Sequence, residues 1–464
     1  MGKDEDRDDQ IPSRPSVYNS GDGEEVELCP ALWSVCQRRV ELGRRACASL
    51  LFAVPPLWAC TPTGVEQRRV EDALLAEDGL RAVYYLQRAH QRGWRVRDAE
   101  EALQQWVRYF HADPSAERPL GLTFHSDRLF RERHLHFLGG ILDGTRALPS
   151  EFLSLEASQT WIAYWVAHAL DVLGRPLTAA EAQGIIKLCR ASQSEHGGYG
   201  GGPGHVAHAA ATYAAVSALC IAGTVDRGAH QVTQRGALTR WMKCDLALAD
   251  GGGGRFRVSL NGEIDVRAVY CVLATASLLG VLDDDLCRGC VAFIDSLRSF
   301  DGAFGGEPLT ESHGGYTYCA VASLRILRDA EWLTAAEFAA LVAPARDWLT
   351  RRQLRFEGGF QGRTHKLVDS CYSFWLAAAA RLCDAPFREP QLAHYILRYC
   401  QDVEHGGLRD KPHVPADLYH TCYALSGLSL TQSTNTEATL RPVHPAYNLT
   451  YDTLHANPFF SKPI

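Results

Sequence analysis

Three residues of the chain, Asp369, Cys371 and His420, have the types and the spacing of ligands for one metal ion. The first two lie in EGGFQGRTHKLVDSCYSFW, residues 357–375, and the third lies in a related segment, residues 404–423. A carboxylate, a thiolate and an imidazole suit Zn²⁺, and three protein ligands leave one coordination position open. The sequence therefore predicts a zinc site at which a substrate thiol could bind and lose its proton.

Each of these residues also has an ordinary explanation, as a helix N-cap (Asp369), a core thiol (Cys371) and a satisfied core histidine (His420). Residues two apart do not share a helix face, so Asp369 and Cys371 could bind one ion only where a helix begins. The stretch after a Gly-rich turn is such a place, and His420 follows a comparable turn. Because all three fall at what we take to be matched helix starts, the metal site is the preferred interpretation.

Cationic residues lie just before the predicted metal ligands. Arg363 and Lys366 are three residues apart, His313 belongs to the preceding related segment, and Tyr372 is adjacent to Cys371. Arginine suits the oxygen geometry of a phosphate. A solvated basic loop is the alternative, but the neighbouring metal candidates favour an anionic substrate.

Large aromatic residues recur in the helical segments. If they face a cavity, they would hold a large apolar ligand, although ordinary core packing explains them equally well. The candidates are Trp161, Trp165, Tyr213, Tyr270, Tyr316, Trp375 and Tyr423. A thiol-activating metal, an anion site and an apolar tunnel together predict one reaction, in which a thiolate attacks an allylic diphosphate and the diphosphate leaves.

The elements that must position these residues form a repeat. Gly-rich turns recur near residues 197, 251, 302, 358 and 406, with a period of about 50 residues, and each is followed by a helical segment rich in small and aromatic residues. Alternating β-branched runs are nearly absent, so the fold class is all-α, built of repeated helix pairs. The period alone does not decide between an open superhelix and a closed ring.

Composition limits the other possibilities. The net charge of −7 argues against a general nucleic-acid binder. Fifteen cysteines, an odd number scattered through the chain, indicate reduced thiols and a cytoplasmic protein. No apolar run reaches the ~18 residues of a membrane span. We expect a disordered acidic tail over 1–28, a helical segment with an insertion of unknown role (about 78–120) over 29–124, and the repeat domain over 125–464.

From about residue 125 onward the chain resembles the β subunits of protein prenyltransferases, and most of all those that transfer farnesyl groups. The motifs that carry the resemblance are GGYGGGPG from Gly197, DVRAVYC from Asp265, SHGGYTYC from Ser312, FEGGFQGR from Phe356, KLVDSCYSFW from Lys366 and DLYHTCY from Asp417. The stretch Ala209–Thr212 departs from the family pattern near the end of the peptide substrate, so the preference for the terminal residue stays open.

This resemblance implies an α–α barrel (toroid) and a role for each candidate residue. It implies zinc on Asp369, Cys371 and His420, with Tyr372 also catalytic, and diphosphate binding by His313, Arg363, Lys366 and Tyr372. It places Trp161, Tyr270, Tyr316, Cys319, Trp375 and Tyr423 around the isoprenoid, Ser158, His208, Arg267 and Tyr419 on the peptide side, and Asp410 as an aid to Mg²⁺.

The resemblance also implies partners. These are a helical-repeat α subunit, farnesyl diphosphate, and proteins such as small GTPases with a C-terminal C-a-a-X cysteine. The bulk of Trp161 and Tyr423, together with Asp410, favours farnesyl over geranylgeranyl transfer. A geranylgeranyltransferase β subunit and a catalytically silent barrel used as a scaffold are the alternatives. Asp283-Asp284-Asp285 lacks the pattern of a terpene cyclase metal motif and predicts a helix N-terminal turn.

Overall fold

The computed structural model describes residues 128–460 apart from 148–149, 249–252, 356, 413 and 432–439. Before residue 128 it describes only 17–19, 25–27, 66, 67 and 70. The chain divides into two compact units, Met1–Asp127 and Arg128–Ile464. In the first unit, β1 (Val17–Asn19) pairs antiparallel with β2 (Glu25–Glu27), inside the stretch predicted as an acidic tail. The rest of that prediction, and nearly all of the one for 29–124, lies outside the described residues.

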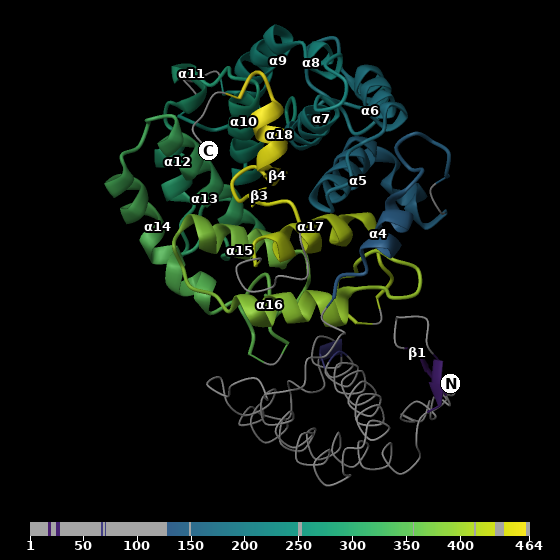
Figure 1. Ribbon diagram of the computed structural model, residues 1–464. Coiled ribbons are helices and arrows are strands. Elements are labelled where there is room, and N and C mark those ends of the chain that lie inside the picture. Colours follow the sequence, from purple (N-terminus) through teal and green to yellow (C-terminus); the bar gives the residue numbers. More distant parts are fainter. Residues whose placement is uncertain are drawn as a thin grey trace, which may run out of the picture. The chain divides into compact units, whose positions relative to one another are not determined.

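Six helices of the second unit form a closed inner ring. Each inner helix packs against the next one, and the last packs back against the first (Figure 1). They are α5 (Gln159–Val172), α7 (Ala209–Ala222), α10 (Val266–Leu278), α13 (Gly314–Asp329), α15 (Tyr372–Leu382) and α17 (Leu418–Ser429). The ring confirms the all-α class and the α–α barrel.

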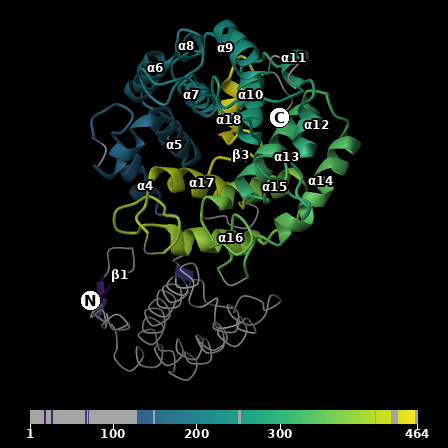
Figure 2. The ribbon, with the colours of Figure 1, turned by 180° about the vertical axis from the view of Figure 1, so that it is seen from behind.

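Ten further helical segments surround this ring among the described residues, as Figure 2 shows from behind. They are α4 (Arg131–Leu138), α6 (Ala179–Ser192), α8 (Ala229–Val232), α9 (Arg235–Trp241), η4 (Met242–Leu246), α11 (Asp284–Cys287), α12 (Cys290–Ser296), α14 (Ala335–Thr350), α16 (Glu389–Tyr395) and η5 (Ile396–Cys400). A 3-10 segment, η3 (Ser150–Ser158), precedes α5. The N-cap of α11 is Asp283, whose side chain accepts a hydrogen bond from the Leu286 N–H, as predicted for a helix N-terminal turn.

Sequence composition explains the two layers. The helix α7 reads AAATYAAVSALCIA and is buried on nearly all sides, because the outer helices cover one face and the ring interior the other. Its small residues allow neighbouring helices to approach closely. The outer helices α6 and α14 instead carry exposed polar faces, and both start with capping boxes, Thr178 with Glu181 and Thr334 with Glu337.

One backbone hydrogen bond recurs where four of the six inner helices begin. In these four, the N–H of the residue that caps the helix, or that stands in the cap's place, donates to the carbonyl of an apolar residue nine positions earlier. The four pairs are His208 with Tyr199 (3.1 Å), His313 with Phe304 (3.1 Å), Asp369 with Phe360 (3.2 Å) and Asp417 with Leu408 (3.2 Å). This common register places equivalent side chains at the same end of the ring.

The C-terminal segment closes the other end. The strands β3 (Val443–His444) and β4 (Leu449–Thr450) pair antiparallel, α18 (Tyr451–Ala456) follows, and all three lie within the ring outline in both views (Figures 1 and 2). The hydroxyls of Tyr164 and Tyr213 donate to the carbonyls of Asn448 and Tyr447, at 2.7 and 2.8 Å. Access to the ring interior is therefore from the end where the inner helices start. Within the part of the chain that is described, no helix has the length and apolarity to cross a membrane.

Candidate active site

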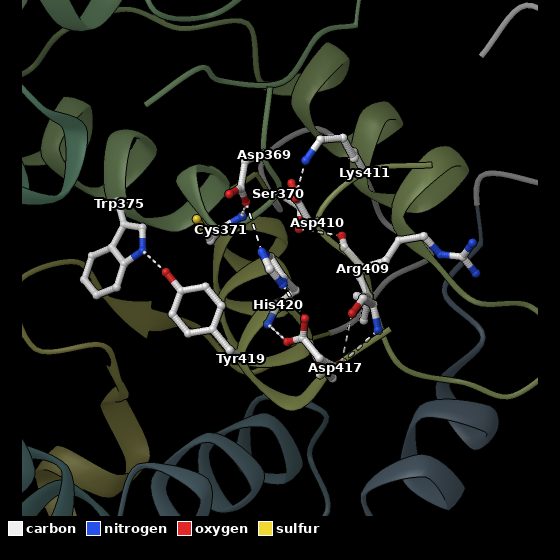
Figure 3. A network of polar contacts seen from close by, with 12 residues as sticks. Asp369, Ser370, Cys371, Trp375, Arg409, Asp410, Lys411, Asp417, Tyr419 and His420 are labelled. Atoms are coloured by element: carbon white, nitrogen blue, oxygen red, sulfur yellow. Dashed lines mark hydrogen bonds and ion pairs between the residues drawn. The ribbon is translucent and has the colours of Figure 1, made fainter. Parts of the chain in front are cut away.

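The three predicted metal ligands meet at the starts of α15 and α17. One ligand atom from each of Asp369, Cys371 and His420 lies within 4.8 Å of the other two. His420 Nε2 is 3.2 Å from Asp369 Oδ1, and the Cys371 side chain is buried (Figure 3). The structure thus brings together a carboxylate, a thiol and an imidazole at the accessible end of the ring.

The backbone turn before α15 explains how residues two apart point to one place. The Cys371 N–H donates to Asp369 Oδ1 at 2.8 Å, so the carboxylate acts as a local cap while its side chain stays beside the thiol. This is the irregular helix start that the sequence predicted. His420, however, does not hold the repeat position of Asp369 or Cys371, because the hydrogen-bond register aligns Asp369 with Asp417 and His420 with Tyr372.

Asp417 orients His420, a role for which the sequence analysis had no prediction. Its carboxylate accepts from the His420 N–H at 2.7 Å and lies 2.6 Å from His420 Nδ1. Burial alone would lower the pKa of His420, but Asp369 and Asp417 raise it to about 10. A carboxylate bound to the far nitrogen of a metal-ligating histidine fixes the ring and leaves Nε2 for the metal. An N-cap aspartate three residues before a histidine was the available signal.

The donor set fits a zinc ion. His420 Nε2 is buried, and its approach to Asp369 does not have hydrogen-bond geometry, so it has no hydrogen-bond partner among the described residues. Burial and the Asp369 carboxylate raise the pKa of the Cys371 thiol. A cation between these atoms would lower the thiol pKa, because it favours the thiolate, and it would be coordinated by the free imidazole nitrogen.

A pocket of about 230 Å³ adjoins the metal ligands. Its wall includes Asp369, so the two sites are continuous. The lining residues are His313, Gly362, Arg363, Lys366, Leu367, Asp369, Tyr372 and Lys411. All four predicted diphosphate-binding residues therefore lie around one pocket, and their binding role stays a prediction.

Hydrogen bonds within the pocket leave donors for an anion. His313 caps α13, with Nδ1 accepting from the Gly315 N–H at 3.0 Å, while its Nε2 lies 3.1 Å from the Tyr372 hydroxyl. Burial and Arg363 lower the pKa of His313, and burial raises that of Tyr372, so both groups are neutral near pH 7. With Nδ1 used as acceptor, the proton of His313 sits on Nε2 and is donated to the Tyr372 oxygen, so the Tyr372 O–H is left to donate to an anion.

Two further charged residues, Asp410 and Lys411, lie beside these groups. Lys411 Nζ contacts Asp410 Oδ2, while Asp410 Oδ1 is buried without a hydrogen-bond partner among the described residues (Figure 3). Burial and the neighbouring Asp369 raise the pKa of Asp410. Lys411 was missed in the sequence analysis, although it holds the same repeat position as Arg363, six residues before the cap.

The predicted isoprenoid residues form an aromatic wall on the inner helices. Trp375 and Tyr423 pack with ring centroids 4.3 Å apart, and Trp161 lies 5.8 Å from Trp165. The Tyr270 hydroxyl donates to the Ala446 carbonyl at 3.0 Å, so this residue also holds the C-terminal segment. Cys319 is buried, and Tyr316 lies half-buried next to His313. Tyr213 and Tyr318 complete the same wall.

The predicted peptide-side residues stand near the starts of four inner helices. Ser158 precedes α5 and is half-buried, and His208 caps α7 by accepting from the Ala211 N–H at 3.2 Å. Arg267 Nε donates to Asp265 at 2.9 Å, and Tyr419 accepts from Trp375 Nε1 at 3.3 Å. They surround the same end of the ring as the metal ligands, and contact with a peptide stays a prediction.

Comparisons with known proteins agree with this fold. Residues 129–449 match the model of the prenyltransferase alpha-alpha toroid domain. The chain is 39% identical over 336 residues to the protein farnesyltransferase subunit beta of Pyricularia oryzae, with 65% of this chain and 63% of that protein covered. The Arabidopsis thaliana farnesyltransferase subunit beta is 33% identical over 65% of this chain and 73% of its own length. The Candida albicans geranylgeranyltransferase-I structure has a TM-score of 0.60 at 22% identity, covers 72% of this chain and 100% of its own, and supports the fold alone.

The chain therefore belongs to the prenyltransferase alpha-alpha toroid family. The curated relatives named above are farnesyltransferase β subunits, which confirms the resemblance drawn from the motifs. The chain spans somewhat under two thirds of the Pyricularia protein.

Proposed function

We propose that this chain is the catalytic β subunit of a heterodimeric protein farnesyltransferase, which transfers farnesyl from farnesyl diphosphate to the cysteine of C-a-a-X proteins. The observation that carries the proposal is the position of Asp369, which belongs both to the Asp369–Cys371–His420 cluster and to the wall of the cationic pocket. A thiol bound at the cluster would therefore lie beside a diphosphate bound in the pocket. The farnesyltransferase β relatives support the same substrate.

The residues of the chain divide the work. Asp369, Cys371 and His420 would hold zinc, which supplies positive charge that favours the thiolate form of the substrate cysteine. The thiolate sulfur then bonds to carbon 1 of the farnesyl group as the carbon–oxygen bond breaks and the diphosphate leaves with that electron pair. His313, Tyr372, Arg363 and Lys366, which line one pocket, would donate to the leaving oxygens, and Asp410 would hold an accompanying Mg²⁺.

The aromatic wall favours farnesyl over the longer geranylgeranyl group. Trp161 packs against Trp165 and Tyr213, and Tyr423 is fully buried against Trp375, so bulky rings occupy the depth of the ring interior. A heterodimer with a helical α subunit and C-a-a-X substrates such as small GTPases belong to the same proposal.

Co-expression with a candidate α subunit tests the proposal. Purified heterodimer should contain about one zinc per β chain and should prefer farnesyl over geranylgeranyl diphosphate when both compete for a C-a-a-X peptide. Cys371→Ala and His420→Ala should each lose zinc and transfer activity while keeping their helical circular dichroism. Full turnover by a zinc-free variant would sink the mechanism, and a preference for geranylgeranyl diphosphate would favour the alternative substrate.

A further inference from the structure

Lys411 is the one pocket-lining cation with no assigned task. It comes from the loop before α17, whereas Arg363 and Lys366 come from the loop before α15. Both Lys411 and Arg363 lie six residues before the aspartate at their helix start, and both reach the same pocket. Two adjacent repeats thus offer one cation each from an equivalent position, on two sides of the space where an anion would bind.

The present partners of these two cations differ in exposure. Arg363 pairs with Glu311 at 3.2 Å, and the two side chains are 40% and 56% exposed, so water screens the pair. Lys411 pairs with Asp410, and these side chains are only 13% and 18% exposed. The Lys411–Asp410 ion pair is therefore less screened by water than the Arg363–Glu311 pair, and Asp410 neutralises Lys411 more effectively.

Asp410 is only half satisfied by this pair. Its Oδ2 contacts Lys411, but its buried Oδ1 has no hydrogen-bond partner among the described residues. The Asp369 carboxylate lies near it (Figure 3), which makes a second negative charge unfavourable unless a cation is close. Asp410 therefore needs a cation whether or not the pocket is filled, and Lys411 supplies one in the empty pocket.

We propose that Lys411 exchanges partners when a diphosphate binds, moving its ammonium from Asp410 to the diphosphate and leaving the Asp410 carboxylate to a divalent cation. A lysine suits this exchange because its ammonium is a point charge on a flexible four-carbon stem. Lys411 then supplies part of the anion binding when Mg²⁺ is absent, and its competition for Asp410 sets how much Mg²⁺ is needed. The inference rests on the proposed function and adds a diphosphate-positioning residue to it.

Two substitutions should act in opposite directions. Lys411→Gln should weaken farnesyl diphosphate binding without Mg²⁺ by about tenfold, the value of one charge-assisted hydrogen bond, and should lower the Mg²⁺ concentration needed for half-maximal effect. Asp410→Asn should free Lys411, tighten binding without Mg²⁺ and abolish the Mg²⁺ effect. Lys411→Arg keeps the charge and should stay close to wild type.

The test is calorimetric binding of farnesyl diphosphate to the zinc-loaded heterodimer with and without Mg²⁺, which needs no turnover. Lys243→Gln is the matched control, because Lys243 also bridges aspartates (Asp283 and Asp285) but lies in η4, in the outer layer. Thermal unfolding of each variant separates misfolding from loss of binding.

If the wild-type heterodimer binds farnesyl diphosphate and Lys411→Gln binds it equally well, the partner exchange is overturned and the proposed function is not. Weaker Mg²⁺-free binding in Asp410→Asn would also overturn it. If the wild-type heterodimer binds no farnesyl diphosphate, the proposed function fails and the exchange fails with it.

Discussion

Asp417→Asn is the substitution that most directly tests the geometry of the metal site. In the present structure one carboxylate oxygen accepts from the His420 N–H at 2.7 Å and the other lies 2.6 Å from His420 Nδ1. Asparagine can keep the cap, but it then turns an amide NH₂ toward Nδ1. Because Nδ1 carries the proton when Nε2 binds a metal, two donors would face each other.

The expected loss can be estimated from these contacts. Removing a carboxylate that orients a ligating histidine typically weakens metal affinity by about 10- to 100-fold, or about 1.4–2.8 kcal/mol. The helix cap itself should lose less, because asparagine caps about as well as aspartate. We therefore expect the zinc dissociation constant to rise by that factor while the free energy of unfolding of the zinc-free protein changes little.

Competition with a fluorescent zinc chelator measures this change on the purified heterodimer. The difference in zinc affinity between wild type and Asp417→Asn should grow as pH rises. The wild-type His420, with its pKa of about 10, must release a proton to bind zinc, whereas the variant lacks the Asp417 carboxylate that raises this pKa, so protons compete less with zinc in the variant at low pH. Asp283→Asn is the control, since Asp283 caps α11 in the outer layer. Unchanged zinc affinity in Asp417→Asn, or an equal loss in both variants, would refute the orienting role.

Three further predictions follow from other parts of the ring. Burial lowers the pKa of His134 to about 4, so the neutral side chain stabilises the fold fully above pH 6.5 and this stability is lost as pH falls toward 4. Urea unfolding at pH 5 should show about 2 kcal/mol less stability than at pH 7 from this group, and His134→Gln should remove this pH-dependent difference. Arg352 Nη1 donates to the Thr364 hydroxyl at 2.7 Å, next to Arg363 in the chain. Arg352→Met should therefore weaken diphosphate binding about fivefold without loss of zinc, and an equal loss of zinc would contradict a role of Arg352 in holding that loop. Trp161→Thr should raise the ratio of geranylgeranyl to farnesyl transfer in a competition assay, and an unchanged ratio would count against the tunnel argument.

Local features of the fold followed from the residues themselves, whereas closure of the ring followed only from the family resemblance. The Gly-rich turns and Ala-rich segments predicted the helix pairs, because each depends on residues within one repeat. Whether six inner helices close depends on the small rotation between repeats, which no single repeat encodes. The contact between α17 and α5, and the tyrosine hydroxyls on the 446–448 carbonyls, join residues more than 170 positions apart and have no local signal.

The metal ligands followed from residue type, but their supporting residues did not. Asp369, Cys371 and His420 are chemically conspicuous in a segment of that kind. Asp417 reads equally well as an ordinary N-cap, and Lys411 as a surface lysine next to an aspartate. The role of Asp417 depends on its carboxylate facing His420 Nδ1, and the role of Lys411 depends on its reaching the pocket wall. Both depend on the packing of α17 against α15.

A single inter-repeat contact underlies both halves of the site. Tyr372, three residues after Asp369 at the start of α15, contacts His313, the cap of α13, at 3.1 Å. His420, three residues after the cap of α17, lies 3.2 Å from Asp369, which stands in the cap's place before α15. The anion site and the metal site are therefore neighbouring copies of one arrangement, in which the residue three positions after the cap, or after the residue in the cap's place, faces the start of the previous helix. The equivalent residues in α7 and α10 are Ala211 and Ala268, which offer no polar group. In α13 the equivalent residue is Tyr316, whose ring lies 5.7 Å from the Arg267 guanidinium at the start of α10, so the polar form of this arrangement recurs at the consecutive junctions from α10 to α17.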